Sequence, residues 1–247
     1  MRKITALIIF LLLAEIGYAQ DPDDPGIKDT VSFCDVEYYV SSEPPFSGTI
    51  KIEVWLYNDS NQIEGLTGIV LPLRWTGPVY FDSGSFLGSK IETLTYKDVS
   101  IDNTNKILIV DAVYSGAYYI IHGKGKLITL FGTVQDTGAF MLDTTRTKSI
   151  ITCFSPVVAY CFSPVIKKLE FRIRPGSLIA GDVSQNSQVG LEDIIALVNY
   201  LYRGETFFVR QILDVNTDCV VNLVDLVFLV NYVLKSGPHP VFGCACY

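Results

Sequence analysis

The chain has 247 residues, a formal net charge of −7 at pH 7, and hydrophobic side chains at 49% of its positions, so it can bury a sizeable core. This length suffices for one large domain, or for a medium domain joined to a small one. Because an acidic chain repels phosphate backbones, the charge excludes nucleic acid as an expected partner.

The first residues, MRKITALIIFLLLAEIGYAQ, are typical of a secretory signal peptide. Arg2 and Lys3 precede a mostly apolar run from Ile4 to Ala14, and small residues lead to a cleavage point after Ala19. The run is too short to span a bilayer, and no later segment supplies about 18 consecutive apolar residues. We therefore expect a signal peptide over residues 1–19 and a secreted protein, extracellular or at the cell surface, with no integral membrane segment.

Residues 28–173 have the composition of short strands. Runs rich in Val, Ile, Thr and Tyr are separated by Gly, Pro, Asn, Asp and Ser, and no convincing amphipathic helix lies between them. The runs are 47–59, 65–75, 90–102, 105–115 and 126–134. They predict an antiparallel β-sandwich that buries alternate residues such as Ile50, Ile52, Val54 and Leu56. The expected fold is mainly β, followed by a small α domain.

After Arg174, Pro175 and Gly176 the apolar residues recur at helical spacing, so we place a domain boundary near Pro175. The pattern occurs twice, 32 positions apart, and each copy predicts a short helix with one buried face. The residues of that face are Leu191, Ile194, Ile195, Val198, Leu201 and Tyr202 in the first copy, and Leu223, Leu226, Val227, Val230, Val233 and Leu234 in the second.

Each helix is preceded by a related phrase, DVSQNSQVGLED at 182–193 and DVNTDCVVNLVD at 214–225. A calcium loop needs oxygen ligands at alternating positions of a tight turn and a carboxylate at position 12. Two such loops in register indicate calcium binding. The expected metal ligands are Asp182, Ser184, Asn186, Gln188 and Asp193 in the first loop, and Asp214, Asn216, Asp218, Val220, Asn222 and Asp225 in the second.

The two loops differ in charge. The second has three carboxylates at ligand positions and the first has two, so we expect two Ca²⁺ sites of which the second is stronger. Ser187 and Cys219 stand where a glycine would ease the turn, and a left-handed non-glycine residue costs about 1–2 kcal/mol. The alternative is a pair of helix N-termini capped by Asp and Asn, with no metal.

Six cysteines in an exported chain permit disulfides. Cys153 and Cys161 lie in an internal echo, CFSPVVAYCFSPV, whose halves could face each other across a hairpin. Cys219, Cys244 and Cys246 cluster near the C-terminus, and Cys34 stands apart. The sequence leaves the pairing open.

Two calcium loops, each followed by one helix, with ALVNYLYRG and FLVNYVLKSG as the helices, resemble the type I dockerin domain over residues 177–240. Dockerins bind cohesin domains in calcium-dependent complexes that assemble polysaccharide-degrading enzymes. The resemblance implies a cohesin-type partner, and a disulfide from Cys219 to Cys244 or Cys246, because antiparallel dockerin helices return the chain end towards the loops. The implied partner-binding residues are Leu191, Glu192, Asn199, Arg203, Leu223, Val224, Asn231 and Lys235.

Residues 28–173 resemble, by their strand texture, the jelly rolls of the cohesin and carbohydrate-binding-module family; the phrases are GLTGIVLPLRW, FDSGSFLGS and KGKLITLFGTV. Carbohydrate modules of this kind stack sugars on exposed aromatic rings. The candidate rings are Trp55, Trp75, Tyr80, Tyr118 and Tyr119. A chain holding both modules could also associate with copies of itself, head to tail.

The sequence favours a protein that is not an enzyme. Only His122 and His239 are present, and neither has a Ser or Cys in a recognisable nucleophile setting. We therefore expect a secreted assembly or adhesion protein whose calcium module docks to a cohesin-type partner, in extracellular polysaccharide degradation. The alternative is a polysaccharide-binding protein in which the sandwich holds glycan and the calcium module is structural.

Overall fold

The computed structural model describes residues 29–57, 68–113, 123–145, 153–155, 163–204 and 209–245. The expected signal peptide at 1–19 lies outside these residues, as do Tyr118, Tyr119, Cys161 and Cys246. None of the described helices is long and apolar enough to cross a bilayer.

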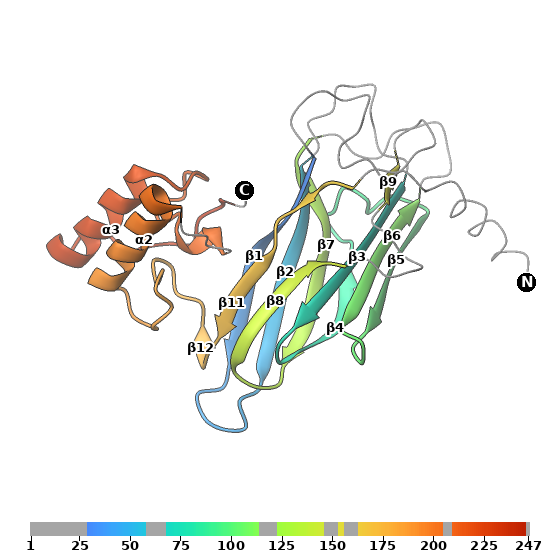
Figure 1. Ribbon diagram of the computed structural model, residues 1–247, viewed down its shortest axis with the longest axis horizontal. Coiled ribbons are helices and arrows are strands. Elements are labelled where there is room, and N and C mark those ends of the chain that lie inside the picture. The colour runs from blue at the N-terminus through green and yellow to red at the C-terminus, as the bar shows by residue number, and fades with distance from the viewer. Residues whose placement is uncertain are drawn as a thin grey trace, which may run out of the picture.

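The strands form two sheets that lie face to face (Figure 1). The first sheet runs β10 (Val165–Ile166), β1 (Thr30–Val40), β2 (Gly48–Tyr57), β7 (Gly125–Val134) and β4 (Val79–Ser85), with β12 (Gly176–Ser177) also paired to β1. The second runs β11 (Leu169–Ile173), β8 (Gly138–Thr144), β3 (Gly68–Thr76), β6 (Ile107–Val113) and β5 (Tyr96–Asp102), with β9 (Cys153–Ser155) paired to β3.

The core between the sheets follows from period-two alternation along the strands. The residues expected to be buried on β2 are all at most 2% exposed, which confirms that prediction; they are Ile50, Ile52, Val54 and Leu56. Aromatic rings fill the centre: Trp75 and Phe81 meet edge to face at 4.9 Å between centroids, and Phe140 lies next to Phe81. The sandwich therefore has a continuous core of its own.

The predicted sandwich is right in class, with two corrections in detail. β1 pairs with β10 in parallel, through Thr30 with Val165, so the architecture is not antiparallel throughout. The run at 90–102 is a strand only from Tyr96. Before it the chain turns, and Ile91 and Leu94 enter the core from that turn. Ile91 and Leu94 are apolar because they are buried in this turn. Periodicity alone does not distinguish a buried turn from a strand.

The C-terminal part holds the two expected helices, α2 (Leu191–Arg203) and α3 (Leu223–Lys235), with a short 3₁₀ turn η1 (Arg210–Ile212) between them. Left-handed residues end both helices, Gly204 at φ 71° and Ser236 at φ 55°. The helices pack on each other through Leu197 and Leu229, which occupy equivalent places in the two repeats. We call α2, α3 and their preceding loops the helical pair.

The prediction that each helix buries its whole apolar face is wrong. In α2 the exposed fractions of Leu191, Ile195 and Tyr202 are 57%, 61% and 63%. In α3 those of Leu223, Val227 and Leu234 are 53%, 50% and 60%. The apolar arc on each helix is wider than the contact with one neighbouring helix can cover, so one half packs inward and the other faces solvent.

Polar contacts join the helical pair to the sandwich. The N–H of Arg172 on β11 donates to Oε1 of Gln185 in the first loop at 3.2 Å. Gln211, 8% exposed, accepts a hydrogen bond from the backbone N–H of Val36 at 3.0 Å and donates one to the carbonyl of Val36 at 2.6 Å. Val36 is free for this because β1 is bulged there, between Cys34 and Glu37. Val209 and Ile212 beside Gln211 join the sandwich core. The segment that leads into the second loop thus contacts β1, while the first loop contacts β11.

Candidate functional site

The first loop, residues 182–193, is held by two carboxylates. Asp182 accepts hydrogen bonds from the backbone N–H groups of Asn186 at 2.9 Å and Ser187 at 2.8 Å, one on each oxygen. Asp193, fully buried, accepts from Ser184 and Gly190, both at 2.7 Å. Every one of these donors lies within the loop itself, so the first loop is closed by its own backbone.

The second loop, residues 214–225, repeats this geometry 32 positions later. Asp225 is fully buried and accepts from Val215 and Asn222, both at 2.9 Å. Asp214, also fully buried, accepts from Cys219 at 3.1 Å, as Asp182 does from Ser187. The residues at position 6 are left-handed in both loops, at φ 72° for Ser187 and 67° for Cys219. The two phrases in the sequence therefore fold into the same turn.

Asp214 differs from Asp182 in its remaining partners. Its Oδ2 also accepts from the backbone N–H groups of Cys244 at 2.9 Å and Ala245 at 3.0 Å, which belong to the C-terminal tail. Its Oδ1 is buried and has no hydrogen-bond partner among the described residues. An unpaired buried carboxylate oxygen is costly, because nothing replaces the water that it loses.

The second loop has the donor set of a cation site. One oxygen each of Asp214, Asp218 and Asp225 lie within 4.8 Å of one another. Two ligands that each stand 2.3–2.6 Å from a calcium ion are at most about 5 Å apart, so these carboxylates fit around one ion. Calcium prefers oxygen ligands of this kind, and Oδ1 of Asp214 is left without a donor among the described residues. The residues present therefore fit Ca²⁺.

Fewer charged oxygens converge in the first loop. The buried Oγ of Ser184 has no hydrogen-bond partner among the described residues, which points to a ligand at that position. Asn186 stands where the second loop has Asp218, and its Oδ1 accepts from Gln188 N–H at 2.9 Å. Asp182 and Asp193 remain as the two carboxylates. The first loop thus has the same shape as the second and one charge fewer.

Helix capping accounts for part of each loop. Asp193 and Asp225 each accept from the N–H of the residue three positions before them, Gly190 and Asn222. At α3 the side chain of Asn222 also accepts from the N–H of Val224, whereas Gly190 at α2 has no side chain to cap the helix. Capping gives no role to Asp218 or to the unpaired oxygen of Asp214. The alternative of capped helices without metal therefore leaves the buried, unpaired Oδ1 of Asp214 unexplained.

Burial also acts on the protonation of the loop carboxylates. Desolvation raises the pKa of Asp182, although the amides of Ser187 and Asn186 oppose the rise. Desolvation likewise raises the pKa of Asp225, against the amides of Asn222 and Asn216. In both loops the folded chain therefore makes it harder to keep a negative charge, unless a cation is bound.

The disulfide expected from Cys219 is present and joins it to Cys244, which confirms that prediction and selects between its two alternatives. The separation of 25 residues makes the cross-link worth about 3 kcal/mol through its effect on the unfolded chain. Cys34 is also disulfide-bonded, so the cysteine that stood apart in the sequence is not a free thiol.

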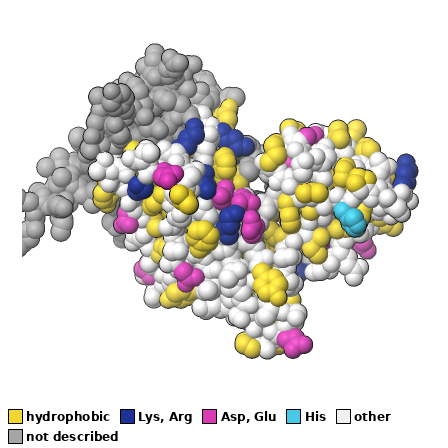
Figure 2. All heavy atoms as spheres, turned by 180° about the vertical axis from the view of Figure 1, so that it is seen from behind, with side chains coloured by type: hydrophobic (Ala, Val, Ile, Leu, Met, Phe, Trp, Pro, Cys, Tyr) yellow, Lys and Arg dark blue, Asp and Glu magenta, His cyan; other side chains and the backbone are white. Residues whose placement is uncertain are grey.

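The exposed apolar residues of the two helices form two equivalent docking faces. The first comprises Leu191, Ile195 and Tyr202, and the second comprises Leu223, Val227 and Leu234, each shifted by 32 positions. In the space-filling view, hydrophobic side chains gather over the part of the surface that the helical pair forms (Figure 2). Exposed apolar patches of this kind mark interaction sites.

The residues implied as partner contacts lie on or beside these faces. Leu191, Leu223 and Val224 are exposed at the helix starts, next to the loops, as is Glu192. Arg203 and Lys235 are exposed in the last turns. Asn199 and Asn231 are half-buried. Sequence reasoning missed Ile195, Val227, Tyr202 and Leu234 as surface residues, because their spacing looked like part of the buried face.

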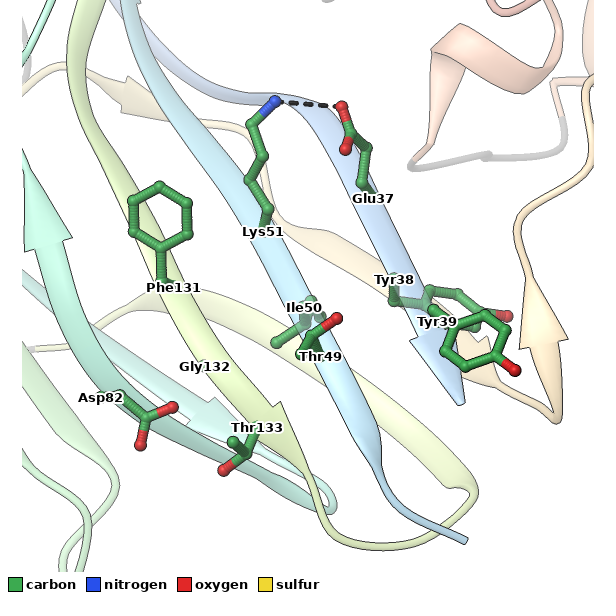
Figure 3. Close-up of a pocket in the computed structure, with 10 residues that line it drawn as sticks. All are labelled: Glu37, Tyr38, Tyr39, Thr49, Ile50, Lys51, Asp82, Phe131, Gly132 and Thr133. Atoms are coloured by element: carbon green, nitrogen blue, oxygen red, sulfur yellow. Dashed lines mark hydrogen bonds and ion pairs between the residues drawn. The ribbon is translucent and has the colours of Figure 1, made fainter. Parts of the chain in front are cut away.

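A shallow groove of about 400 Å³ lies on the outer side of the first sheet (Figure 3). Across four strands the register aligns Tyr39, Thr49, Thr133 and Tyr80, and paired residues point to the same side of a sheet. Both tyrosines are well exposed, at 62% and 46%. The row therefore carries hydroxyl groups between two aromatic rings; Tyr39 lines the groove, and Tyr80 lies beside it, paired with Thr133.

The next row of the groove carries charge and a third ring. Lys51 pairs with Glu37 at 3.0 Å and also with Asp35, and Phe131 stands beside Lys51 on β7. Asp82 lines the opposite wall. Hydrogen-bonding groups and aromatic faces thus alternate along one surface.

The aromatic residues that the sequence suggested for stacking sugars differ in their exposure. Trp75 is fully buried and its indole N–H donates to the carbonyl of Val79 at 3.0 Å, so that candidate is wrong. Trp55 is half-buried and donates to Glu53 at 2.8 Å. Tyr80 is exposed on β4, beside Thr133 of the groove. Tyr39 and Phe131 were missed, since a sequence does not indicate which face of a strand will be covered.

No protein-family model matches this sequence, and no curated protein matches it either. Solved structures of cohesin modules do match. A chain of a type I cohesin–dockerin complex from Clostridium thermocellum aligns over 59% of this chain and 99% of its own length, at 13% identity and a TM-score of 0.45.

A type III cohesin module from the cell-surface anchoring scaffoldin of Ruminococcus flavefaciens aligns over 65% of this chain and 98% of its own length, at 15% identity and a TM-score of 0.43. A non-cellulosomal cohesin from the archaeon Archaeoglobus fulgidus aligns over 60% and 92%, at 14% identity and a TM-score of 0.37.

Proposed function

We propose that this chain is an exported, non-catalytic assembly protein whose helical pair binds calcium and docks onto a cohesin-type β-sandwich. The observation that carries the proposal is Asp214: its carboxylate is fully buried, its Oδ1 has no partner among the described residues, and one oxygen each of Asp218 and Asp225 lies within 4.8 Å of one of its own. Outside a cation site this arrangement is destabilising, because like charges lie close together and two of the three, Asp214 and Asp225, are fully buried.

When bound, calcium supplies the positive charge that holds the loop oxygens together. Asp214 and Asp218 would hold it from the loop, and Asp225 from the first turn of α3. The carbonyl of Val220 and the side chains of Asn216 and Asn222 would complete the set in the second loop. Because Asp225 belongs to α3, ligand closure orients the start of that helix, and with it the exposed Leu223 and Val224.

The partner that we propose is a β-sandwich of the cohesin type, on the strength of the dockerin-like loops and of the two docking faces. Each face sets apolar residues beside a basic last turn, with Arg203 on α2 and Lys235 on α3. A complementary surface would therefore be apolar with an acidic margin. Since the two faces are equivalent by the 32-residue shift, either one can meet the same partner in turn.

Binding of the full-length chain to a panel of purified cohesin modules tests this proposal. We expect binding with calcium and its loss in chelator. The double variant Leu191→Asp and Leu223→Asp should abolish binding, whereas Leu87→Asp, at a sandwich residue that is 74% exposed, should not. Binding that survives chelation, equal losses from Leu87→Asp and the double variant, or no binding to any cohesin would contradict the proposal.

The same two surfaces raise the question of self-association. A copy whose helical pair docks on the sandwich of the next copy makes a heterologous contact, which grows into open chains unless it closes as a ring. Light scattering with and without calcium measures this, and we expect larger species only with calcium. A monomer at high concentration in both conditions would remove self-association and leave a separate partner.

The groove on the first sheet favours a second candidate function, the binding of a glycan by the sandwich. Sugar rings have an apolar face and hydroxyl edges, so they suit aromatic rings that flank hydrogen-bonding groups. The row from Tyr39 to Tyr80 crosses four strands, a span of about 14 Å at the usual strand spacing, which accommodates a chain of several sugars.

Retention of the full chain on insoluble polysaccharides, in chelator, tests this second function apart from calcium-dependent docking. Tyr39→Ala and Tyr80→Ala should each weaken retention, by roughly tenfold together, because each removes a stacking surface. The control is Tyr96→Ala on β5 of the other sheet, a tyrosine with 56% exposure. No retention of the unmodified chain, or equal losses from Tyr96→Ala, would rule out glycan binding at the groove.

A further inference from the structure

The C-terminal tail lies across the second loop at close range. The N–H of Gly243 donates to the carbonyl of Gln211 at 3.0 Å, and the next two N–H groups, of Cys244 and Ala245, both reach Oδ2 of Asp214. Ala245 is only 5% exposed, so the end of the tail is buried against the loop. The tail thus provides two of the three hydrogen bonds that orient this carboxylate.

Gly243 shows how closely the tail approaches. A Cβ atom at this position would overlap Cγ and Oδ2 of Asp214 and its carbonyl oxygen. Only a residue without a side chain allows the following amides to point at the carboxylate from this distance. The tail and Asp214 therefore form one close-packed unit.

The disulfide fixes this unit to the turn of the loop. Cys219 occupies position 6, where its own N–H donates to the same Oδ2, and its sulfur is bonded to Cys244. One covalent bond thus links the loop donor with the tail donors. In the first loop Ser187 has the same position, and Asp182 accepts only from within the loop among the contacts that the structure describes.

We propose that tail residues Gly243, Cys244 and Ala245, held by the Cys219–Cys244 disulfide, are positioning residues of the second calcium site. Three N–H groups on Oδ2 fix the Asp214 carboxylate in one orientation and leave Oδ1 as its single oxygen for the ion. This rests on the proposed calcium binding and adds that the affinity of the second site depends on the tail. Without the disulfide the tail no longer contacts the loop, and the ion itself must order the Asp214 carboxylate.

Calorimetric titration of the full-length chain with calcium tests the tail. The double variant Cys219→Ser and Cys244→Ser removes the disulfide without leaving a free thiol, and Gly243→Ala displaces the tail while keeping the disulfide. Either change should weaken one of two binding events at least about tenfold and leave the other unchanged, because hydrogen bonds to a charged group are lost. Val241→Ala is the control, since its side chain is 58% exposed in the same tail.

The outcomes separate the two proposals. If the unmodified chain binds no calcium, the proposed function fails and the role of the tail fails with it. If the unmodified chain binds calcium and both variants bind it with unchanged affinities, the tail has no positioning role, while calcium binding stands. Circular dichroism at saturating calcium checks that each variant has folded. Reduction of the unmodified chain with dithiothreitol, which also opens the disulfide of Cys34, is a further test without substitution: affinity at one site should fall, and an unchanged affinity overturns the proposal.

Discussion

The two loops of the helical pair share one backbone and differ in what surrounds it. Both have a buried carboxylate at position 12, which accepts from the N–H of the residue before the helix, and a left-handed residue at position 6. Only the second has a third carboxylate and a tail bonded over it. A duplicated sequence can therefore keep its fold in both copies while one copy gains charge and support from outside the repeat.

The largest effect expected is the loss of order after removal of Asp214. Asp214→Ala deletes the carboxylate that joins the loop, the tail and the proposed ion, so we expect the calcium-induced helicity of residues 176–247 to disappear. Asp182→Ala removes a carboxylate with donors only from its own loop and should weaken this ordering without abolishing it. Circular dichroism of both variants during calcium addition measures the difference.

Equal losses of helicity from Asp214→Ala and Asp182→Ala would contradict the inequality of the loops. Full helicity of the unmodified chain in chelator would contradict the coupling of calcium to folding in both of them.

A negative charge added to the first loop should reduce the difference in calcium affinity between the two loops. Asn186→Asp supplies the carboxylate that Asp218 supplies in the second loop, and we expect calcium affinity of the first site to rise roughly tenfold or more. The matched control is Gln185→Glu, which adds the same charge at a non-ligand position of the same loop. A rise of equal size in the control would mean that general electrostatic attraction, and not ligand number, separates the two loops.

Relief of backbone strain should have a smaller effect. Ser187 is left-handed at φ 72°, which costs a non-glycine residue about 1–2 kcal/mol. Ser187→Gly removes that cost but gives the unfolded chain more freedom, about 0.5–1 kcal/mol in the opposite direction. We expect the free energy of unfolding to rise by less than about 1 kcal/mol. Thermal denaturation in calcium measures this change. A lower melting temperature would show that the Ser187 side chain has another role.

The smallest effect that we expect is a dependence of stability on pH, which is common to both loops and appears without calcium. Burial raises the pKa of Asp182 and Asp225, so the folded chain binds their protons more tightly than the unfolded chain does. The stability contributed by protonation is full below the ordinary value of 3.8 and is lost as pH rises through the folded pKa values. In chelator the helical pair should therefore melt higher as pH falls towards that range.

With saturating calcium this trend should reverse, because protons then compete with the ion for the same oxygens. Melting curves of the helical pair that depend on pH in the same direction with and without calcium would contradict ion binding at these carboxylates.

The sequence predicted the features that depend on local pattern. Alternation along β2 identified Ile50, Ile52, Val54 and Leu56 as core, and the repeated phrase predicted that both loops would form the same turn. Features that depend on what a side chain meets in space were not predictable. The hydrogen bonds between Gln211 and Val36 need a bulge in β1, and the sequence does not predict that bulge. The exposure of Ile195 and Val227 depends on how much of each helix is covered by the neighbouring helix.

The C-terminal tail also makes contacts at the second loop that the sequence does not predict. The sequence placed a cysteine within reach of Cys219, and that much followed from the return of the chain end. The use of the N–H groups of Cys244 and Ala245 on Asp214 did not, because backbone donors have no sequence signature. The requirement for Gly243 is visible only once the carboxylate beneath it has been located.

A crystal structure of the full chain grown with limiting calcium tests the central claim most directly. The account predicts an ion in the second loop, bonded to Oδ1 of Asp214 and to Asp218 and Asp225, with the first loop filled only when calcium is in excess. A second loop without an ion at saturating calcium, or a first loop that fills before it, would contradict the account.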